Sequence, residues 1–255
     1  MEGETKVVLL SGAAGGIGRA AALKFASTGA ALALTDIPQD GLRETARLAG
    51  EAGAQVWAHT CDISLEDDVT GLIEGAVTRF GRLDIAVNNA GIAHEPARIA
   101  DLDLATFQRM LAVNLTGTFL CLRAQTAIMR EQGHGSILNV ASLAGLVGAP
   151  LLGAYAAAKH GVVGLTKTAA AECARSRVRV NALCPSFADT AMVGAIASGM
   201  RGSADEAVSR LLAGIPMGRL ASPQEIAEAI VWITGDANSF MTGQAVALDG
   251  GASAV

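Results

Sequence analysis

The residues best suited to carry out a reaction are a tyrosine and a lysine four positions apart, in Tyr155-Ala-Ala-Ala-Lys159. The surrounding segment has a helical pattern, so this spacing places the phenol and the ammonium on one face of a helix. A free tyrosine has a pKa near ~10, and a neighbouring ammonium stabilises the phenolate and lowers that pKa. Ser142, thirteen residues earlier at the end of a predicted strand, could donate to the same substrate oxygen. The three side chains indicate proton exchange with an alcohol or ketone oxygen.

A glycine-rich turn near the start of the chain is typical of a dinucleotide site. The first predicted strand runs into Ser11-Gly12-Ala13-Ala14-Gly15-Gly16-Ile17-Gly18, and a predicted helix follows. Gly12 allows a sharp turn, Gly16 lets the backbone approach a pyrophosphate, and Gly18 lets the helix pack on the sheet. The free N–H groups of the helix suit phosphate oxygens. The spacing G-x-x-x-G-x-G differs from the general fingerprint, but the strand and the helix are its required context. We therefore predict a cofactor contact at Gly12, Gly15, Gly16, Ile17 and Gly18.

Asp36 ends the second predicted strand, eighteen residues past Gly18. A carboxylate at this position accepts hydrogen bonds from both ribose hydroxyls of an adenosine and repels a 2′-phosphate. No cation stands where a 2′-phosphate would lie, at Ala13, Ala14, Gly15 and Ile37. This pattern predicts NAD(H) rather than NADP(H). The alternative is that Asp36 is a turn residue before Pro38.

Taken together, these features resemble the classical subtype of the short-chain dehydrogenase/reductase family. The resemblance covers practically the whole chain. It rests on the glycine-rich turn, Asp62 after the third predicted strand, Asn88-Asn89-Ala90-Gly91, Asn114, Ser142, Tyr155 with Lys159, and Asp249-Gly250-Gly251. It implies a catalytic tetrad of Asn114, Ser142, Tyr155 and Lys159.

The resemblance also implies a role for each member of the tetrad. Tyr155 is the general acid and base, and Ser142 polarises or orients the substrate oxygen. Lys159 holds the nicotinamide ribose and tunes Tyr155, while Asn114 holds a water that relays protons from Lys159 toward solvent. Taken singly, each residue has a structural alternative. Asn114 could satisfy a carbonyl inside a helix, Ser142 could be a turn residue, Lys159 a solvated charge and Tyr155 a packing aromatic.

Further cofactor contacts follow from the same resemblance, which also counts Tyr155 and Lys159 among the cofactor-binding residues. Asp62 and Ile63 border the adenine, and Asn89, with Ala90 and Gly91, borders the adjacent ribose. Pro185 and Ser186 lie beside the nicotinamide, and the hydroxyl of Thr190 meets its carboxamide or the diphosphate. The chain departs from the family pattern at two positions. Ser11 replaces the usual threonine but keeps the hydroxyl. Ser186 replaces the usual glycine, so it restricts the backbone conformation there or adds a hydrogen-bond donor to the pocket.

Short apolar runs alternate with helical patterns along the chain. Strands are predicted at 6–10, 31–36, 54–62, 83–89, 136–142, 178–185 and 244–249, and helices near 17–28, 40–52, 65–80, 104–131, 154–174, 205–213 and 223–234. Several strands are apolar at consecutive positions, as in a parallel sheet covered on both faces. This alternation predicts right-handed βαβ units and a Rossmann-type, doubly wound, seven-stranded α/β fold. No linker or internal repeat is visible, so residues 1–255 are predicted to form one domain.

The segment 186–215, between the sixth and seventh strands, is the irregular part of the pattern. A long excursion of this kind is a lid or binding loop, or simply two short surface helices. The variable walls of the substrate pocket are expected at 93–98, 143–152 and 186–215. Their apolar side chains predict a small apolar alcohol or ketone as substrate: Leu143, Leu146, Val147, Leu151, Leu152, Met192, Val193, Ile196 and Met200. No arginine is clearly placed to bind a carboxylate or a phosphopantetheine. The arginines left open for such a role are Arg98, Arg201 and Arg219.

Composition excludes several classes of protein. The 255 residues carry a formal net charge of −5, which argues against a nucleic-acid partner. Charged residues make up 17% and hydrophobic residues 51%, which excludes intrinsic disorder. The uncharged stretch 132–158 is too polar and too broken by glycine to span a membrane. It is predicted to form a strand, a loop and the start of a helix.

Cysteine and histidine usage points to a cytoplasmic protein without a metal site. The four cysteines form no C-x-x-C pair, so reduced thiols are expected, and no secretory signal is visible. The four histidines are scattered, which argues against a metal centre. His94 and Glu95 are expected to form an exposed loop pair, with a position at the edge of the pocket as the alternative. The resemblance implies a homotetramer in which the helices 104–131 and 154–174 pair between subunits, with a dimer as the alternative.

These patterns predict an NAD(H)-dependent oxidoreductase that interconverts a secondary alcohol and a ketone. One alternative within the family is a reductase of 3-oxoacyl thioesters carried on acyl carrier protein or coenzyme A. NADPH use is common in that role, and Asp36 counts against it. An alternative of another class is a non-catalytic protein that senses a dinucleotide or acts as a scaffold. Such relatives usually lack the tyrosine or the lysine, and this chain keeps both.

Overall fold

A parallel sheet of seven strands forms the centre of the computed structural model, which describes residues 5–199 and 204–255. The strands are β1 (Val7–Ser11), β2 (Ala31–Asp36), β3 (Val56–Thr60), β4 (Ile85–Asn88), β5 (Gly135–Val140), β6 (Val178–Pro185) and β7 (Ala245–Leu248). Their order across the sheet is β3-β2-β1-β4-β5-β6-β7. All seven predicted strands are confirmed, with ends that shift by at most two residues.

The strand order reverses between β1 and β4: the chain adds β2 and β3 on one side of β1, and β4 to β7 on the other side. Val8 of β1 pairs with Leu32 of β2 on one side and with Ile85 of β4 on the other. The segments that follow β1 and β4 therefore leave the sheet in opposite directions. In open α/β sheets, ligands bind in the crevice at the carboxyl ends of the strands at such a switch point.

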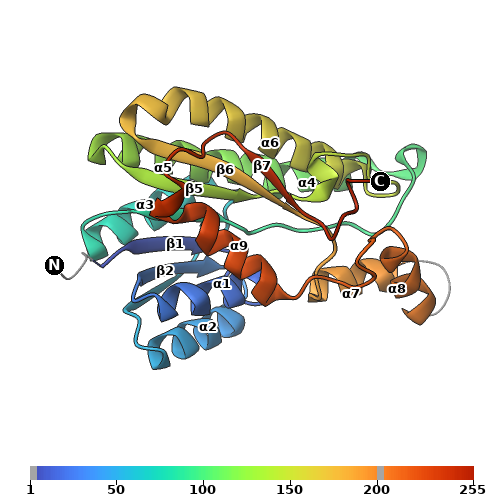
Figure 1. Ribbon diagram of the computed structural model, residues 1–255, viewed down its shortest axis with the longest axis horizontal. Helices are drawn as coiled ribbons and strands as arrows, with labels where there is room; N and C mark the ends of the chain where they lie inside the picture. Colours follow the sequence, from blue (N-terminus) through green and yellow to red (C-terminus); the bar gives the residue numbers. More distant parts are fainter. Residues whose placement is uncertain (1–4, 200–203) are drawn as a thin grey trace.

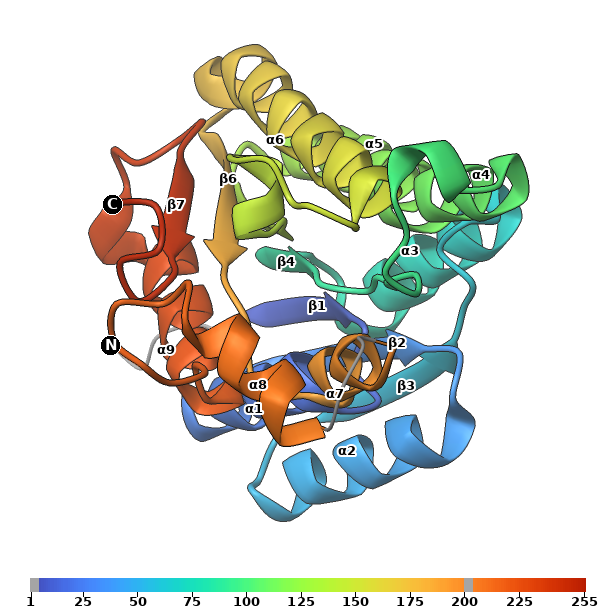
Figure 2. The same cartoon turned by 90° about the vertical axis from the view of Figure 1, so that its right-hand side faces the viewer.

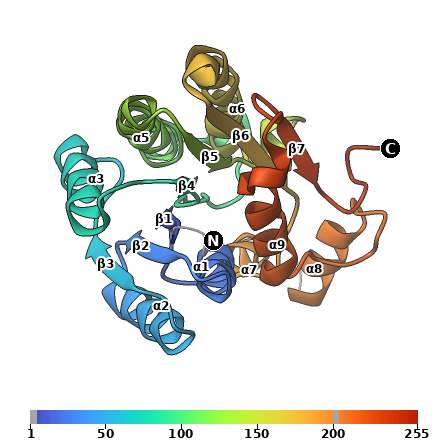
Figure 3. The ribbon, with the colours of Figure 1, turned by 60° about the vertical axis from the view of Figure 1, so that its left-hand side comes forward.

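Helices cover both faces of the sheet (Figures 1 and 3). One face carries α1 (Gly16–Ser27), α2 (Gln39–Glu51) and α9 (Pro223–Thr234), and the other carries α3 (Glu66–Phe80), α5 (Thr118–Gln132) and α6 (Gly153–Cys173). Phe25 and Ile230 are buried in the first layer, and Leu72 and Met129 in the second. Apolar strands covered in this way confirm the doubly wound fold. None of the helices in the described ranges combines the length and the apolar character needed to cross a lipid bilayer.

A buried polar network ties the second helix layer to the sheet just below the carboxyl ends of the strands. The Asn88 and Gln125 amides exchange two hydrogen bonds of 2.8 and 2.9 Å, and the Asn88 amide also donates to Asn139 at 2.8 Å. The Asn139 amide in turn donates to the Thr166 hydroxyl at 2.9 Å. All four side chains are buried, and each finds a partner inside the protein. The network fixes α5 and α6 against β4 and β5.

The predicted helix 104–131 is interrupted. It consists of α4 (Leu104–Leu111), a π-type turn over Ala112–Gly117, and then α5. The helical periodicity of the sequence did not reveal this turn, because one wider turn keeps the chain helical and changes the direction of a single side chain. The re-aimed side chain is that of Asn114, which bonds the main chain of Ile92.

The segment 186–215 contains two short helices, α7 (Ala191–Ser198) and α8 (Ala204–Leu212). They lie beyond the carboxyl ends of the strands, close to the α1 side of the molecule (Figure 2). Val193 and Ala197 of α7 pack against Ala207 and Leu211 of α8 in a small cluster of their own. The two-helix interpretation is therefore right, and α7 also lines a cavity, as described below.

Candidate active site

Two adjoining hollows open at the carboxyl ends of the strands. The first, here called the strand-end cleft, measures about 320 Å³ and runs from Asp36 past the glycine-rich turn to Asn89 and Thr190. The second, here called the Tyr155 cavity, measures about 310 Å³. The two share several lining residues: Ile17, Asn89, Gly91, Thr190 and Met192. A single elongated ligand could therefore extend from one into the other.

The glycine-rich turn leaves open space where a phosphate group would need it. A Cβ at Gly15 would meet no protein atom within 4 Å, and Gly16 has a φ of +50° that favours glycine. Gly12 has a φ of +71°, and a Cβ there would lie 2.6 Å from the Asn89 amide nitrogen. α1 begins at Gly16, so its free N–H groups lie at the cleft. These features fit a dinucleotide pyrophosphate.

Gly18 is the exception among the predicted cofactor glycines. It does not line the cleft, and a Cβ there would overlap the carbonyl oxygen of Gly12. Gly18 therefore allows the close packing of α1 on the turn, and its own contact with the cofactor stays a prediction.

Asp36 lies at the far end of the strand-end cleft and is half-buried. Its Oδ2 accepts the N–H of Ala14 at 2.8 Å, and its Oδ1 accepts the N–H of Ile37 at 2.8 Å. Each carboxylate oxygen keeps capacity for a further donor. The nearby Arg19 guanidinium donates to the Ala14 carbonyl at 2.6 Å and the Gly41 carbonyl at 3.2 Å. Asp36 and Arg19 thus both bond the main chain of Ala14, which holds the carboxylate in place.

The predicted contacts along β3 and β4 also lie at the cleft. Asp62, Ile63, Asn89, Ala90 and Gly91 all line it. The buried Ser11 hydroxyl accepts the N–H groups of Asn89 at 3.1 Å and Ala90 at 3.2 Å. Serine thus supplies a hydroxyl at the position where the family usually has threonine. Sequence reasoning missed several apolar or neutral lining residues that carry no motif: Thr35, Cys61, Ile92, Val113 and Ala191.

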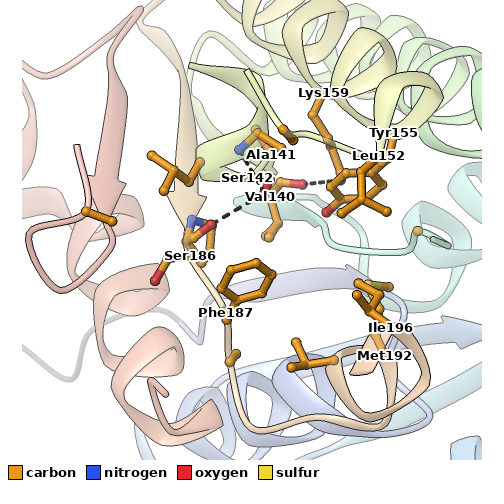
Figure 4. A pocket seen from close by; sticks show the side chains of 18 of the residues that line it. Val140, Ala141, Ser142, Leu152, Tyr155, Lys159, Ser186, Phe187, Met192 and Ile196 are labelled. Carbon is orange, nitrogen blue, oxygen red and sulfur yellow. Dashed lines mark hydrogen bonds between the residues drawn. The ribbon is translucent and has the colours of Figure 1, made fainter. Parts of the chain in front are cut away.

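Tyr155 and Lys159 lie on one face of α6, as their spacing predicts, and both line the Tyr155 cavity (Figure 4). The Lys159 Nζ is 5.6 Å from the centre of the Tyr155 ring and donates to the Val140 carbonyl at 2.8 Å. Ser142 follows β5 and accepts the N–H of Ala144 at 3.2 Å. Its hydroxyl donates to the Pro185 carbonyl at 3.5 Å and lies close enough to the Tyr155 phenol to influence the pKa of that group. Three members of the predicted tetrad therefore meet in one cavity.

Burial shifts the pKa values of both titratable groups. It raises the pKa of Tyr155 above its ordinary value of 10.0, and the hydrogen bond from Ser142 opposes that rise. Burial lowers the pKa of Lys159 from 10.5 to about 8. Both shifts favour the neutral form in the protein alone, so a charged ligand in the cavity would change the balance.

Asn114 lies behind this group and lines neither hollow. Its side chain accepts the N–H of Ile92 and donates to the Ile92 carbonyl, both at 2.9 Å. A Cβ at Gly91 would lie 2.6 Å from the Asn114 Oδ1 and 3.6 Å from the Lys159 Nζ. Asn114 thus supports the Asn-Ala-Gly turn beside Lys159, and its role in proton relay stays a prediction.

Six of the nine predicted apolar wall residues line the Tyr155 cavity: Leu143, Val147, Leu152, Met192, Val193 and Ile196. Two predictions were wrong. Leu146 packs instead with Val162 and its neighbours, and Leu151 is 42% exposed in a left-handed turn with φ of 68°. Met200 lies outside the described residues.

The 93–98 loop supports the cavity wall from behind and does not line it. The Ala97 N–H donates to the Leu151 carbonyl at 2.9 Å. The expected exposure of His94 was wrong, because the side chain is only 8% exposed while Glu95 stays exposed. His94 Nδ1 lies 2.8 Å from the Glu95 carbonyl, and its buried Nε2 has no partner among the described residues. Nothing in the sequence around His94 indicated that this side chain is buried.

Sequence reasoning missed part of the cavity that comes from the end of the chain. Ala252 lines it, together with Gly214 and Ile215 at the end of the predicted wall segment 186–215. The Met217 N–H donates to the Gly250 carbonyl at 3.1 Å, and Gly250 and Gly251 have φ values of 63° and 91°. The Asp-Gly-Gly turn was the available signal, because two left-handed glycines fold the last residues back toward the site.

Among the described residues that line the Tyr155 cavity, Lys159 is the one basic side chain. Of the arginines considered, Arg98 is exposed on its loop and Arg219 pairs with Glu225 at 2.7 Å. Arg201 lies outside the described residues. Within the described lining, an anionic substrate group would find no arginine.

Comparisons with known proteins agree with this geometry. A family model described as "Enoyl-(Acyl carrier protein) reductase" matches residues 12–253. The chain is 41% identical to cis-4-hydroxycyclohexanecarboxylate dehydrogenase of Sinomonas cyclohexanicum, over 98% of this chain and 97% of that protein. It is 37% identical to the 3-oxoacyl-[acyl-carrier-protein] reductase FabG of Thermotoga maritima, over 97% and 98%. The crystal structure of levodione reductase superposes with a TM-score of 0.96 at 36% identity, covering 98% of both chains.

Proposed function

This chain belongs to the short-chain dehydrogenase/reductase family, and on that premise we propose that it is an NAD(H)-dependent dehydrogenase interconverting a small, apolar, cyclic secondary alcohol and its ketone. The observation that carries the proposal is the continuity of the two hollows. Asp36 stands at one end, and Tyr155, Ser142 and Lys159 stand at the other, among apolar walls. The whole chain acts as one catalytic domain, with α7 and α8 at the substrate side.

The protein's own residues supply binding and proton transfer. A bound nicotinamide dinucleotide supplies the acceptor or donor of hydride. In alcohol oxidation, the Tyr155 phenolate takes the hydroxyl proton, while Ser142 donates to the same oxygen and stabilises charge there. Lys159 holds the nicotinamide ribose and favours the phenolate. The apolar walls exclude water around these groups.

Asp36 is proposed to select NAD(H). Replacing it by asparagine (Asp36→Asn) should lower kcat/KM for NAD⁺ by about tenfold, because one charge-assisted hydrogen bond contributes roughly 1.5–3 kcal/mol. The discrimination against NADP⁺ should shrink as well, because the repulsion of a 2′-phosphate is removed. Asp40→Ala is the control, since Asp40 is exposed at the start of α2 and pairs with Arg43. Equal effects of both variants, or an unchanged NAD⁺/NADP⁺ ratio in Asp36→Asn, would count against the proposal.

The experiment that tests the activity itself is a substrate panel. Initial rates of NAD⁺ and NADP⁺ reduction are measured with aliphatic, cyclic and aryl secondary alcohols, diols and 3-hydroxyacyl thioesters. We expect turnover of cyclic secondary alcohols with NAD⁺ preferred. Turnover that prefers NADP⁺ and the thioesters would support a 3-oxoacyl thioester reductase, the second candidate that the Thermotoga relative favours. Tight NADH binding without any turnover would support a sensing protein.

A homotetramer is proposed, built from two surfaces. One is the shallow groove between α5 and α6, lined by Leu115, Phe119, Gly161 and Leu165, where the Phe119 side chain is 42% exposed. The other is the open edge of β7. The aromatic side chains of Trp232 in α9 and Phe240 before β7 are also exposed. Free buried cysteines support a reducing compartment such as the cytoplasm.

The groove between α5 and α6 gives a direct test of assembly. Phe119→Glu should convert a four-chain species to a smaller one in sedimentation velocity, because an unpaired carboxylate would be buried at the interface. Circular dichroism should show the helical content unchanged. A variant that stays tetrameric would exclude this groove as an interface.

A further inference from the structure

Ser186 places a hydroxyl on the wall of the Tyr155 cavity, at a position where the family usually has glycine. It follows directly after β6, and its N–H donates to the Leu248 carbonyl of β7 at 3.2 Å. Its backbone is not among the left-handed positions, which for non-glycine residues in the described ranges are Leu151 and Arg177. A side chain therefore fits here without strain, and what the serine adds is its hydroxyl.

Apart from Tyr155, which is the proposed reacting group, the other polar side chains that line this cavity each have a hydrogen-bond partner in the protein. Ser142 and Lys159 bond main-chain groups, and the Thr190 hydroxyl donates to the Ala188 carbonyl at 3.4 Å. The Asn89 amide donates to the Ser11 and Gly12 carbonyls. Within the part of the chain that the structure describes, the half-buried Ser186 hydroxyl has no such partner. A hydroxyl on an apolar wall is stabilised when a ligand supplies one.

The surroundings restrict what that ligand group can be. Ser186 and Tyr155 lie on opposite sides of Ser142, and Phe187, Met192 and Ile196 form a neighbouring apolar wall (Figure 4). A substrate whose reacting oxygen lies at Tyr155 and Ser142 would meet one further polar side chain, Ser186, on the remaining substrate wall. A carboxylate there would be desolvated without a cation, at a large cost. A neutral hydroxyl or carbonyl oxygen would be matched.

We propose that the Ser186 hydroxyl binds a second, neutral oxygen of the substrate, so that the preferred substrates are cyclic diols or hydroxyketones. This inference rests on the proposed alcohol dehydrogenase activity and deepens it. Ser186 is a specificity-determining residue, and the reacting centre stays with Tyr155 and Ser142.

The test compares cyclohexanol with cyclohexane-1,2-, -1,3- and -1,4-diol as substrates of the full-length enzyme with NAD⁺. The wild type should have a higher kcat/KM for at least one diol than for cyclohexanol. Ser186→Ala and Ser186→Gly should lower that diol's kcat/KM by about 3- to 10-fold, the range of one neutral hydrogen bond. The loss on cyclohexanol should be smaller than the loss on the diol, so the ratio of kcat/KM for the diol to kcat/KM for cyclohexanol should fall. Ser198→Ala is the control, because it removes a hydroxyl that donates to the Gly194 carbonyl within α7.

The outcomes separate this inference from the proposed function. Oxidation of cyclohexanol with a diol ratio that Ser186→Ala leaves unchanged would overturn the role of Ser186 and leave the alcohol dehydrogenase intact. Equal losses on both substrates with a raised KM for NAD⁺ would assign the hydroxyl to the cofactor and also overturn it. If the wild type oxidised none of these alcohols while it bound NADH, both proposals would fall.

Discussion

Replacing Tyr155 by phenylalanine is expected to lower kcat/KM for alcohol oxidation by about 10²- to 10⁴-fold, the usual contribution of general acid–base catalysis. The substitution keeps the aromatic ring at this position of α6 and removes only the phenol oxygen. No other tyrosine exists in the chain to replace it. Among the described residues that line the cavity, Lys159 is the other titratable group, and its ammonium bonds the Val140 carbonyl. Steady-state rates of NAD⁺ reduction measure the loss.

Two controls distinguish a lost proton transfer from a damaged site. Tyr155→Phe should bind NADH with a Kd within a few-fold of the wild type, because most of the predicted dinucleotide contacts lie in the strand-end cleft and Tyr155 does not line it. Its melting temperature should change little, because phenylalanine keeps the ring and the oxygen that is lost belongs to a residue on the cavity wall. Residual activity within tenfold of the wild type would remove Tyr155 from the role of general base.

The single tyrosine also allows the same group to be titrated directly. In the protein alone, burial raises the pKa of Tyr155, so its phenolate absorbance should appear at higher pH than that of a free tyrosine. With NAD⁺ bound, a positive charge beside the phenol favours the phenolate, and the apparent pKa should fall below the free value of ~10. Tyr155→Phe provides the blank for both titrations. An unshifted titration in the NAD⁺ complex would contradict the proposed role.

The features that sequence could predict depend on local spacing. The glycine-rich turn lies between a strand and a helix that are both adjacent in sequence, so its position at the sheet edge follows from the chain itself. The four-residue spacing of Tyr155 and Lys159 fixes their common helix face before any tertiary contact is known. Asp36 ends a strand, and the parallel sheet brings that end to the edge that holds the glycine-rich turn.

The features that sequence could not predict depend on contacts between distant segments. The π-type turn at Asn114 exists because its amide bonds Ile92, twenty-two residues away. His94 is buried although a loop histidine after a glycine turn is usually exposed. Leu146 and Leu151 follow the same apolar pattern as Leu152, and only tertiary packing decides which of the three faces the cavity. Ala252 joins the cavity because two left-handed glycines fold the chain end back.

Replacing Lys159 by methionine should abolish most activity and at the same time stabilise the fold. The activity loss should reach about 10²-fold or more in kcat/KM, because the ammonium no longer favours the Tyr155 phenolate or holds the ribose. The gain in stability follows from the burial of Lys159, which is 4% exposed. Burial lowers its pKa from 10.5 to about 8. That shift corresponds to a destabilisation on the order of 3 kcal/mol at neutral pH.

The sign and the pH range of this effect can be checked. Below pH 8 both the folded and the unfolded chain carry the Lys159 proton, so the folded protein bears the full cost of the buried ammonium. Between about pH 8 and 10.5 the unfolded chain binds more protons than the folded one, so the free energy of unfolding rises with pH through this range. The methionine variant lacks this rise. Its advantage over the wild type should therefore be largest near pH 7 and should shrink toward pH 10.

Urea unfolding of both proteins at pH 7 and pH 10 measures the difference. The methionine leaves the Val140 carbonyl without its donor, which offsets the gain by about 1 kcal/mol. Lys159→Arg is the matched control, because a guanidinium stays charged and should lower activity without any gain in stability. A methionine variant that is less stable than the wild type at pH 7 would show that the buried ammonium stabilises the fold. In that case Lys159 would act as a structural link between α6 and β5, and the activity lost on its removal could not be attributed to Tyr155.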